Sequence, residues 1–107
     1  MKTHQIDFPN LPWQNPAPGV RMKVHRSGNT QIRLVEFSRD FVEIDWCRRG
    51  HVGYVLNGRL EVTFDMSTEV FAMGDGIFIP AGDAHRHKTR TLTDTATVVL
   101  IEEAAPT

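Results

Sequence analysis

The residues of this 107-residue chain with the most reactive side chains gather in two short stretches. Cys47 and His51 stand four residues apart where a strand is predicted to begin, and His85 and His87 lie two residues apart further along. A thiolate together with imidazoles is a ligand combination that favours zinc. Plainer interpretations compete: a lone cysteine is commonly a small buried residue, and a histidine after Gly50 can simply bind a backbone carbonyl.

Two carboxylates precede Cys47. Alternation over residues 41–47 predicts a strand in which Glu43, Asp45 and Cys47 share one face. The opposite face, predicted to be the core side, carries Val42, Ile44 and Trp46. Glu43 is a candidate general base, with an exposed strand glutamate as the alternative, and Asp45 is either a metal ligand or a carboxylate that orients an imidazole.

Short alternating segments separated by Gly, Asn, Asp and Pro run through most of the chain, and no window has a sustained helical period. The predicted strands cover residues 20–25, 32–37, 41–47, 51–56, 59–65, 70–72, 77–80, 85–89 and 96–101. Asn57-Gly58 is the dipeptide most typical of a two-residue type I′ hairpin. Eight or nine such strands predict a compact antiparallel sandwich or barrel.

The first 19 residues differ from the rest. Four prolines among polar residues exclude a helix and predict an extended arm over residues 1–19, followed by a barrel over 20–107 in a single domain. The apolar points of the arm are Ile6, Phe8, Leu11 and Trp13. We expect these side chains to lie against the barrel of the same chain or against a partner subunit.

The charge balance and the apolar content of the chain argue against nucleic acids and membranes as partners. Lys and Arg total 12 against 13 Asp and Glu, a balance that argues against a nucleic-acid surface. No apolar run approaches the ~20 residues that a membrane span needs. The N-terminus has no secretory apolar segment, and the single cysteine cannot form an intrachain disulfide, so we expect a cytoplasmic protein.

Four residues at fixed spacing point to a family. Gly74, Pro80, Gly82 and His85 match the second cupin motif, a Gly, five residues, Pro-x-Gly, two residues and His. Gly58, preceded by an apolar Tyr-Val-Leu run, matches the close of the first motif. The chain therefore resembles a small single-domain cupin of the RmlC-like type. This resemblance implies a double-stranded β-helix, or jelly-roll barrel, of about eight or nine antiparallel strands.

The same resemblance implies where a metal would bind. Cupins typically use three histidines and a glutamate, and the corresponding positions here read Asp45, Cys47, His51 and His85. The first motif is thus a variant in which every substitute is itself a possible ligand. His87 lies two residues past His85, on the same face of the predicted strand, and is a further candidate. It is either a ligand or a residue that supports the ligands or faces solvent. Zinc is the expected metal, with iron, manganese or nickel as alternatives.

We therefore expect a stand-alone cupin that binds a divalent metal, a small molecule or both in its barrel. One alternative is a metal-dependent enzyme of the isomerase, lyase or dioxygenase type acting on a small polar substrate, and another is a metal-free barrel that binds a ligand. Small cupins resemble one another in packing against a second copy, so a homodimer is also expected.

Overall fold

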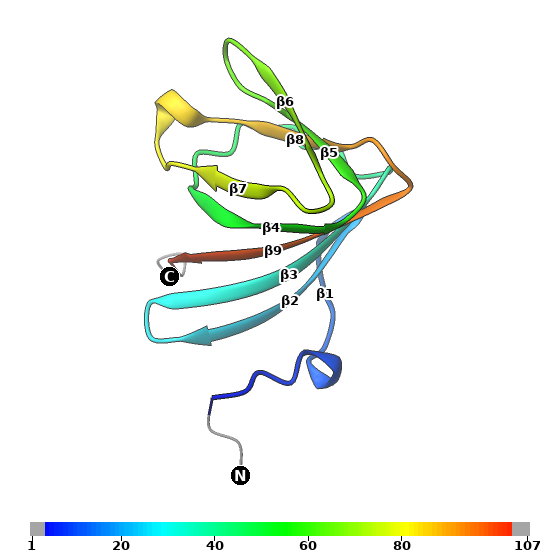
Figure 1. The fold of residues 1–107 in the computed structure, drawn as a ribbon, viewed down its shortest axis with the longest axis vertical. Coiled ribbons are helices and arrows are strands. Elements are labelled where there is room, and N and C mark those ends of the chain that lie inside the picture. The colour runs from blue at the N-terminus through cyan, green and yellow to red at the C-terminus, as the bar shows by residue number, and fades with distance from the viewer. Residues whose placement is uncertain (1–3, 104–107) are drawn as a thin grey trace.

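The computed structural model describes residues 4–103, and these form two antiparallel sheets that face each other (Figure 1). The larger sheet has six strands in the order β1 (Gln14–Ala17), β2 (Val20–Ser27), β3 (Thr30–Ser38), β9 (Thr95–Glu103), β4 (His51–Asn57) and β7 (Gly76–Ile79). The smaller sheet has the order β6 (Thr68–Ala72), β5 (Arg59–Thr63) and β8 (Lys88–Thr91). The nine strands confirm the predicted all-β class.

Two short 3-10 helices, η1 (Phe8–Asn10) and η2 (Asp83–His85), complete the described part of the chain. Within residues 4–103 no helix has the length and apolar character needed to cross a membrane.

The core lies between the two sheets, where the alternating apolar residues of facing strands meet. Its buried members are Val35, Val55, Leu60, Val62, Ile77, Ile79, Ala96, Val98 and Leu100. Each strand presents every second side chain to this space, as the pleat requires. On β9 the inward set is Ala96, Val98 and Leu100, so the next inward position along the strand is Glu102.

The N-terminal arm lies against β2 of its own chain. β1 pairs antiparallel with β2, and the ammonium of Lys23 donates to the backbone oxygen of Phe8 at 2.8 Å. The Trp13 ring stacks beneath Arg21, whose guanidinium carbon lies 4.0 Å from the ring centroid. Lys23 points away from the core yet is only 8% exposed, because the arm covers it. Of the two surfaces predicted for the arm, the arm contacts the edge of its own barrel.

The Asn57-Gly58 turn is not the predicted hairpin. β4 and β5 belong to different sheets, so the turn carries the chain from one layer to the other. Gly58 has φ +78°, whereas no described residue other than glycine has a positive φ, so Asn57 does not meet the requirement of a type I′ turn. The dipeptide marks the end of the strand correctly, but the partner of that strand is set by β7 and β9.

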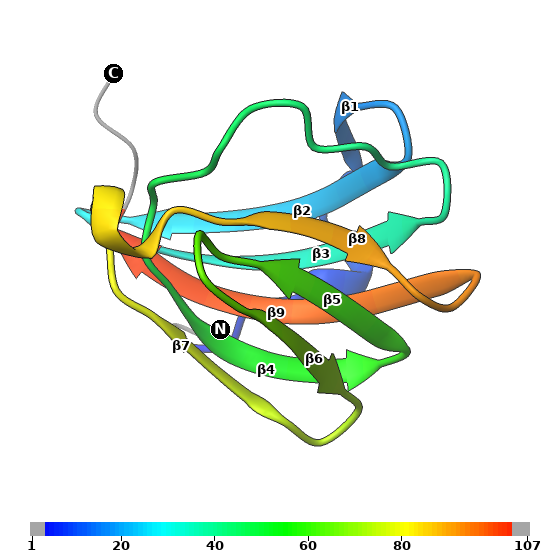
Figure 2. The same cartoon turned by 90° about the horizontal axis from the view of Figure 1, so that it is seen from above.

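Residues 41–47 do not form the predicted strand either. β3 and β4 both pair antiparallel with β9, so they run parallel to each other, and parallel strands need a long crossover. Residues 39–50 supply it, and in Figure 2 they run along the top of the view from the end of β3 to the start of β4. Val42 and Ile44, predicted to be core residues, are 74% and 79% exposed, and Trp46 lies under Arg86 and Lys88.

Candidate metal centre

One end of the barrel collects the start of β4, the end of β9 and the segment that leads from η2 into β8 (Figure 2). The crossover reaches the same end, where Cys47 forms an isolated bridge with His87. The two residues exchange backbone hydrogen bonds of 2.9 Å in both directions. Three segments that are distant in sequence are thereby held together around one point.

Cys47, His51 and His87 meet at this point. Their ligand atoms all lie within 4.8 Å of one another, and Cys47 Sγ is 3.6 Å from His51 Nε2. His87 is buried, and Cys47 and His51 are partly buried. The two imidazole rings meet edge to face with their centroids 5.2 Å apart. The cluster thus combines one sulfur and two nitrogen donors in a largely enclosed site.

Both imidazoles are oriented through Nδ1. His51 Nδ1 lies 3.1 Å from a carboxylate oxygen of Glu102, and His87 Nδ1 lies 3.0 Å from the backbone oxygen of His85. Carboxylate and carbonyl oxygens only accept, so in the neutral rings Nδ1 carries the proton and Nε2 keeps its lone pair. Metal-binding histidines are typically held in this way, by a carboxylate or a carbonyl on the second nitrogen.

The charges within the cluster are coupled. The hydrogen bond with His51, followed by that with His87, lowers the pKa of Cys47 from 9.0 to about 5. Burial opposes a charged His51, but its contacts with Cys47 and Glu102 more than offset this, and the pKa of His51 is raised. Near neutral pH Cys47 is therefore a thiolate, the form that acts as a metal ligand and as a nucleophile.

Glu102 holds His51 in place through the contact with Nδ1. Its side chain is 4% exposed, accepts from Gln31 at 2.8 Å and from Arg33 at 3.2 Å, and forms an ion pair with Arg49 at 3.7 Å. Burial alone would raise its pKa, but the hydrogen bonds from His51 and Arg33 reverse the effect and hold the pKa at about 2. Glu102 is therefore ionised throughout the physiological pH range and fixes the orientation of His51.

The cluster forms part of the wall of an internal cavity of about 300 Å³ that lies between the sheets. Most of the remaining wall is apolar and comes from the core strands, including Val35, Leu60, Val62, Ile77, Val98 and Leu100. The lining also includes the exposed residues Ala17 and Arg49, so the cavity opens to solvent. A small molecule in this space would therefore contact the thiolate and both imidazoles directly.

Comparison with known proteins identifies the family. A model of the cupin domain matches residues 48–102, just over half of the chain. The chain belongs to the cupin family. No curated protein matches this cupin in sequence.

Solved structures agree with this assignment at the level of the fold. The polyketide cyclase RemF from Streptomyces resistomycificus superposes with a TM-score of 0.79 at 18% identity, covering 97% of this cupin and 81% of that chain. KdgF from a Halomonas species gives 0.76 at 22% identity, covering 94% of each chain. An RmlC-like cupin from Shewanella frigidimarina gives 0.75 at 16% identity, covering 97% and 93%. The predicted RmlC-like jelly roll is confirmed.

The structure separates the predicted site residues into two groups. Cys47, His51 and His87 come together, and Glu43 lines the same cavity. His85 lies on η2 and is exposed, in a separate surface hollow beside Phe78 and Pro80. His85 and His87 do not share a strand face as predicted, because η2 ends at His85 and β8 begins only at Lys88.

Asp45 is also exposed and does not line the cavity of this cupin, although it lies midway between two residues that do, Glu43 and Cys47. Glu43 accepts a hydrogen bond of 2.8 Å from the backbone N–H of Thr89. Burial raises the pKa of Glu43 despite that hydrogen bond, and the nearby Cys47 thiolate adds to the effect. A carboxyl with a raised pKa in a cavity is suited to accept and donate protons.

The sequence analysis does not single out Glu102, which lies directly after the predicted strand over residues 96–101. The signal was the two-residue period of β9, because Glu102 follows Ala96, Val98 and Leu100 on the inward face. A carboxylate on that face must have partners. Here the partners are His51, Arg33 and Gln31.

Proposed function

We propose that this cupin binds one divalent metal ion, zinc in the first instance, through Cys47, His51 and His87, and takes a small molecule in the adjoining cavity. The observation that carries the proposal is the orientation of the two imidazoles. In each ring Nδ1 is hydrogen-bonded to an oxygen, so the lone pair of Nε2 is available to a metal ion that Cys47 would also bind. One thiolate and two imidazoles suit zinc, and three protein ligands leave the fourth position for water or a ligand.

The test is metal analysis of the full chain purified without a histidine tag. We expect close to one zinc per chain in the wild type. His87→Gln should lower the zinc affinity at least about 100-fold, because loss of a direct ligand exceeds the 10–100-fold effect of altering a residue that orients one. His85→Gln is the matched control, since it changes a histidine two positions away that is exposed on η2, and it should keep the metal.

Two results would overturn the proposal. One is a wild-type metal content at background level, which would favour a metal-free barrel. The other is an equal loss of zinc in His85→Gln and His87→Gln, which would return the ligand role to the histidine of the cupin motif. Cys47→Ser provides a second direct variant and should also lose the metal. A ligand thiolate must remain reduced, so the proposal includes a reducing, cytoplasmic setting.

A second candidate is a metal-dependent enzyme, and it is favoured by Glu43. Zinc at an open site supplies a Lewis acid that polarises a bound oxygen. Glu43 lines the same cavity and would hold or accept the proton. Turnover that is lost in Glu43→Gln while zinc remains bound would select the enzyme, whereas ligand binding with no turnover would select the binding protein. The similarity to a polyketide cyclase does not distinguish the two outcomes, since a shared fold does not determine function.

We also propose that two copies pack through the outer face of the larger sheet. Phe78 on β7, Val52 on β4 and Ile101 on β9 are direct neighbours in the strand register and point away from the core. They are 77%, 46% and 49% exposed. A contiguous apolar row of this kind on a sheet face is typical of an interface, and a two-fold axis would pair the row with its own copy.

A further inference from the structure

The wall of the cavity is strongly divided between apolar and polar groups. Fourteen of its 21 lining residues are apolar, and they come from strands of both sheets, from the arm and, in the case of Phe41, from the crossover. The polar residues are Arg33, Glu43, Cys47, Arg49, His51, His87 and Thr89. Most of these are linked at the metal-site end, either within the cluster or through Glu102. Any bound molecule therefore meets hydrocarbon over most of its surface and polar groups at one end.

This division is incompatible with a polyhydroxylated ligand. Each sugar hydroxyl that leaves water needs a hydrogen-bond partner, and an unpartnered hydroxyl in an apolar environment is costly. The side chains of Val35, Leu60, Val62, Val98 and Leu100 offer none. A volume of about 300 Å³ corresponds to roughly ten water molecules, which is enough for a short hydrocarbon chain or a single ring.

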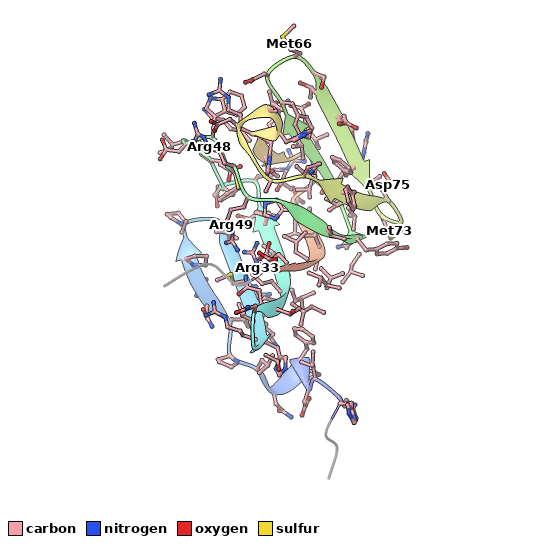
Figure 3. All side chains as sticks on the ribbon, turned by 90° about the vertical axis from the view of Figure 1, so that its left-hand side faces the viewer. Arg33, Arg48, Arg49, Met66, Met73 and Asp75 are labelled. Atoms are coloured by element: carbon pink, nitrogen blue, oxygen red, sulfur yellow. The ribbon has the colours of Figure 1, made fainter. Side chains whose placement is uncertain are left out.

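The polar end of the cavity favours a ligand that carries a negative charge. Arg33 and Arg49 both line the cavity and both contact Glu102, and Figure 3 shows them near each other, with Arg48 set apart. Arginine is always protonated, and a bound zinc ion would add two further positive charges. Against these four charges stand at most three negative ones, on Glu43, Cys47 and Glu102. The metal-loaded site thus has an excess of positive charge beside an open coordination position.

We infer that the ligand of this cavity is a small, mainly apolar carboxylic acid, with its hydrocarbon body between the sheets and its carboxylate at the Cys47–His51–His87 end. This inference rests on the proposed metal site and adds the chemical class of the ligand. It differs from the small polar substrate of the enzyme alternative given in the sequence analysis, because the apolar wall is assembled from core positions of strands in both sheets.

The test is calorimetric titration of the full chain, with and without bound zinc, using three kinds of probe that each carry six or seven carbon atoms. Hexanoate and benzoate are the apolar acids, hexanamide and benzamide are their neutral counterparts, and gluconate is the polyhydroxylated acid. On the zinc-loaded protein we expect the apolar acids to bind at least about tenfold more tightly than both gluconate and the amides. On metal-free protein the preference over gluconate should persist.

Two matched pairs of variants locate the ligand. Val62→Thr adds a hydroxyl to the cavity wall and should weaken hexanoate binding at least about fivefold, whereas Val70→Thr, an exposed valine on the adjacent strand, should not. Arg49→Gln should reduce the preference for acid over amide, and the neighbouring Arg48→Gln, which does not line this cavity, should leave it unchanged.

Zinc content is measured on every sample, so a failure of the proposed metal site can be distinguished from a failure of the inferred ligand class. Absence of zinc from the wild type would overturn the metal site. If gluconate bound as tightly as hexanoate to zinc-loaded and metal-free protein alike, the inferred ligand class would be wrong even with the metal in place. Amides that bind as tightly as acids to the zinc-loaded protein would also overturn it, because they would show that the carboxylate is not recognised. These wild-type titrations decide the matter even if a variant fails to fold.

Discussion

At the scale of single residues, Glu102 joins the candidate site to the rest of the protein. It holds His51 by one contact and is itself held by Gln31 and Arg33 on β3 and by Arg49 from the crossover. A buried carboxylate with several charged partners stabilises a fold only while it remains ionised. The pKa of Glu102, about 2, shows that its partners more than compensate for its burial.

This leads to a prediction for stability against pH. Because the folded-state pKa lies below the ordinary value of 4.5, the stabilisation by Glu102 is fully present above about pH 4.5 and is lost as the pH falls towards 2. The full shift is equivalent to roughly 3 kcal/mol. We expect about 2 kcal/mol of it, because the partner Arg49 is partly exposed and solvent screens that ion pair.

The measurement is the free energy of unfolding of metal-free protein in urea between pH 7 and pH 2. Glu102→Gln should be less stable than the wild type at pH 7, and the difference should shrink as the pH falls. Glu103→Gln, its exposed neighbour, should follow the wild type throughout. A difference between Glu102→Gln and the wild type that stayed constant from pH 7 to pH 2 would mean that the charge of Glu102 contributes nothing to stability.

Part of the site can be predicted at this scale. The motif count places His51 at a ligand position, and the two-residue period groups Glu43 with Cys47, both of which line the cavity. The same period fails between His85 and His87, because the turn of η2 intervenes and the two histidines no longer share a face. Which side of the 41–47 segment faces inward could not be predicted, since it depends on a crossover set by the sheet order.

At the scale of elements, turns were predicted where they occur, but the partners of the strands that they connect were not always found. Ser27-Gly28-Asn29 lies between the predicted strands over residues 20–25 and 32–37, and it joins β2 and β3 as an antiparallel pair. Gly74-Asp75-Gly76 leads from β6 into β7. Asn57-Gly58 has an equally strong local signal and joins two different sheets. Local turn chemistry fixes where a strand ends, whereas pairing depends on contacts distant in sequence.

The two glycine turns give a matched prediction. Gly28 and Gly58 both have positive φ, so alanine at either position is strained by about 1–2 kcal/mol. A Cβ at Gly28 meets nothing within 4 Å, whereas a Cβ at Gly58 would clash with the backbone oxygen of Thr95. Gly58→Ala should therefore cost clearly more than Gly28→Ala, near the upper end of the ~0.5–3 kcal/mol range of ordinary substitutions.

The free energy of unfolding in urea provides the measurement, with the slope of the transition used to check that both variants unfold in the same way as the wild type. Equal losses for Gly28→Ala and Gly58→Ala would show that the close packing of this turn against β9 contributes nothing. A larger loss at Gly58 would support its role in holding the two sheets together at the end of the barrel opposite the Cys47–His51–His87 cluster.

At the scale of the whole molecule, the outer face of the larger sheet is divided into two halves. Over β2 the arm provides the cover, and Lys23 is buried beneath it. Over β9, β4 and β7 no described segment of the chain performs this role, and Phe78, Val52 and Ile101 stay exposed. The arm thus covers one half of this face, and the apolar half, through which we propose that a second copy packs, stays exposed.

A single charged substitution tests this arrangement. Phe78→Glu places a carboxylate in the middle of the proposed interface, where in a two-fold pair it would approach its own copy and lose its hydration. We expect the wild type to be a dimer at micromolar concentration by light scattering, and Phe78→Glu to be a monomer with its zinc content unchanged. Met66→Glu is the control, since Met66 is 94% exposed at the tip of the β5–β6 hairpin on the other sheet (Figure 3). A monomeric wild type would refute the dimer, and a dimeric Phe78→Glu would move the interface to another face.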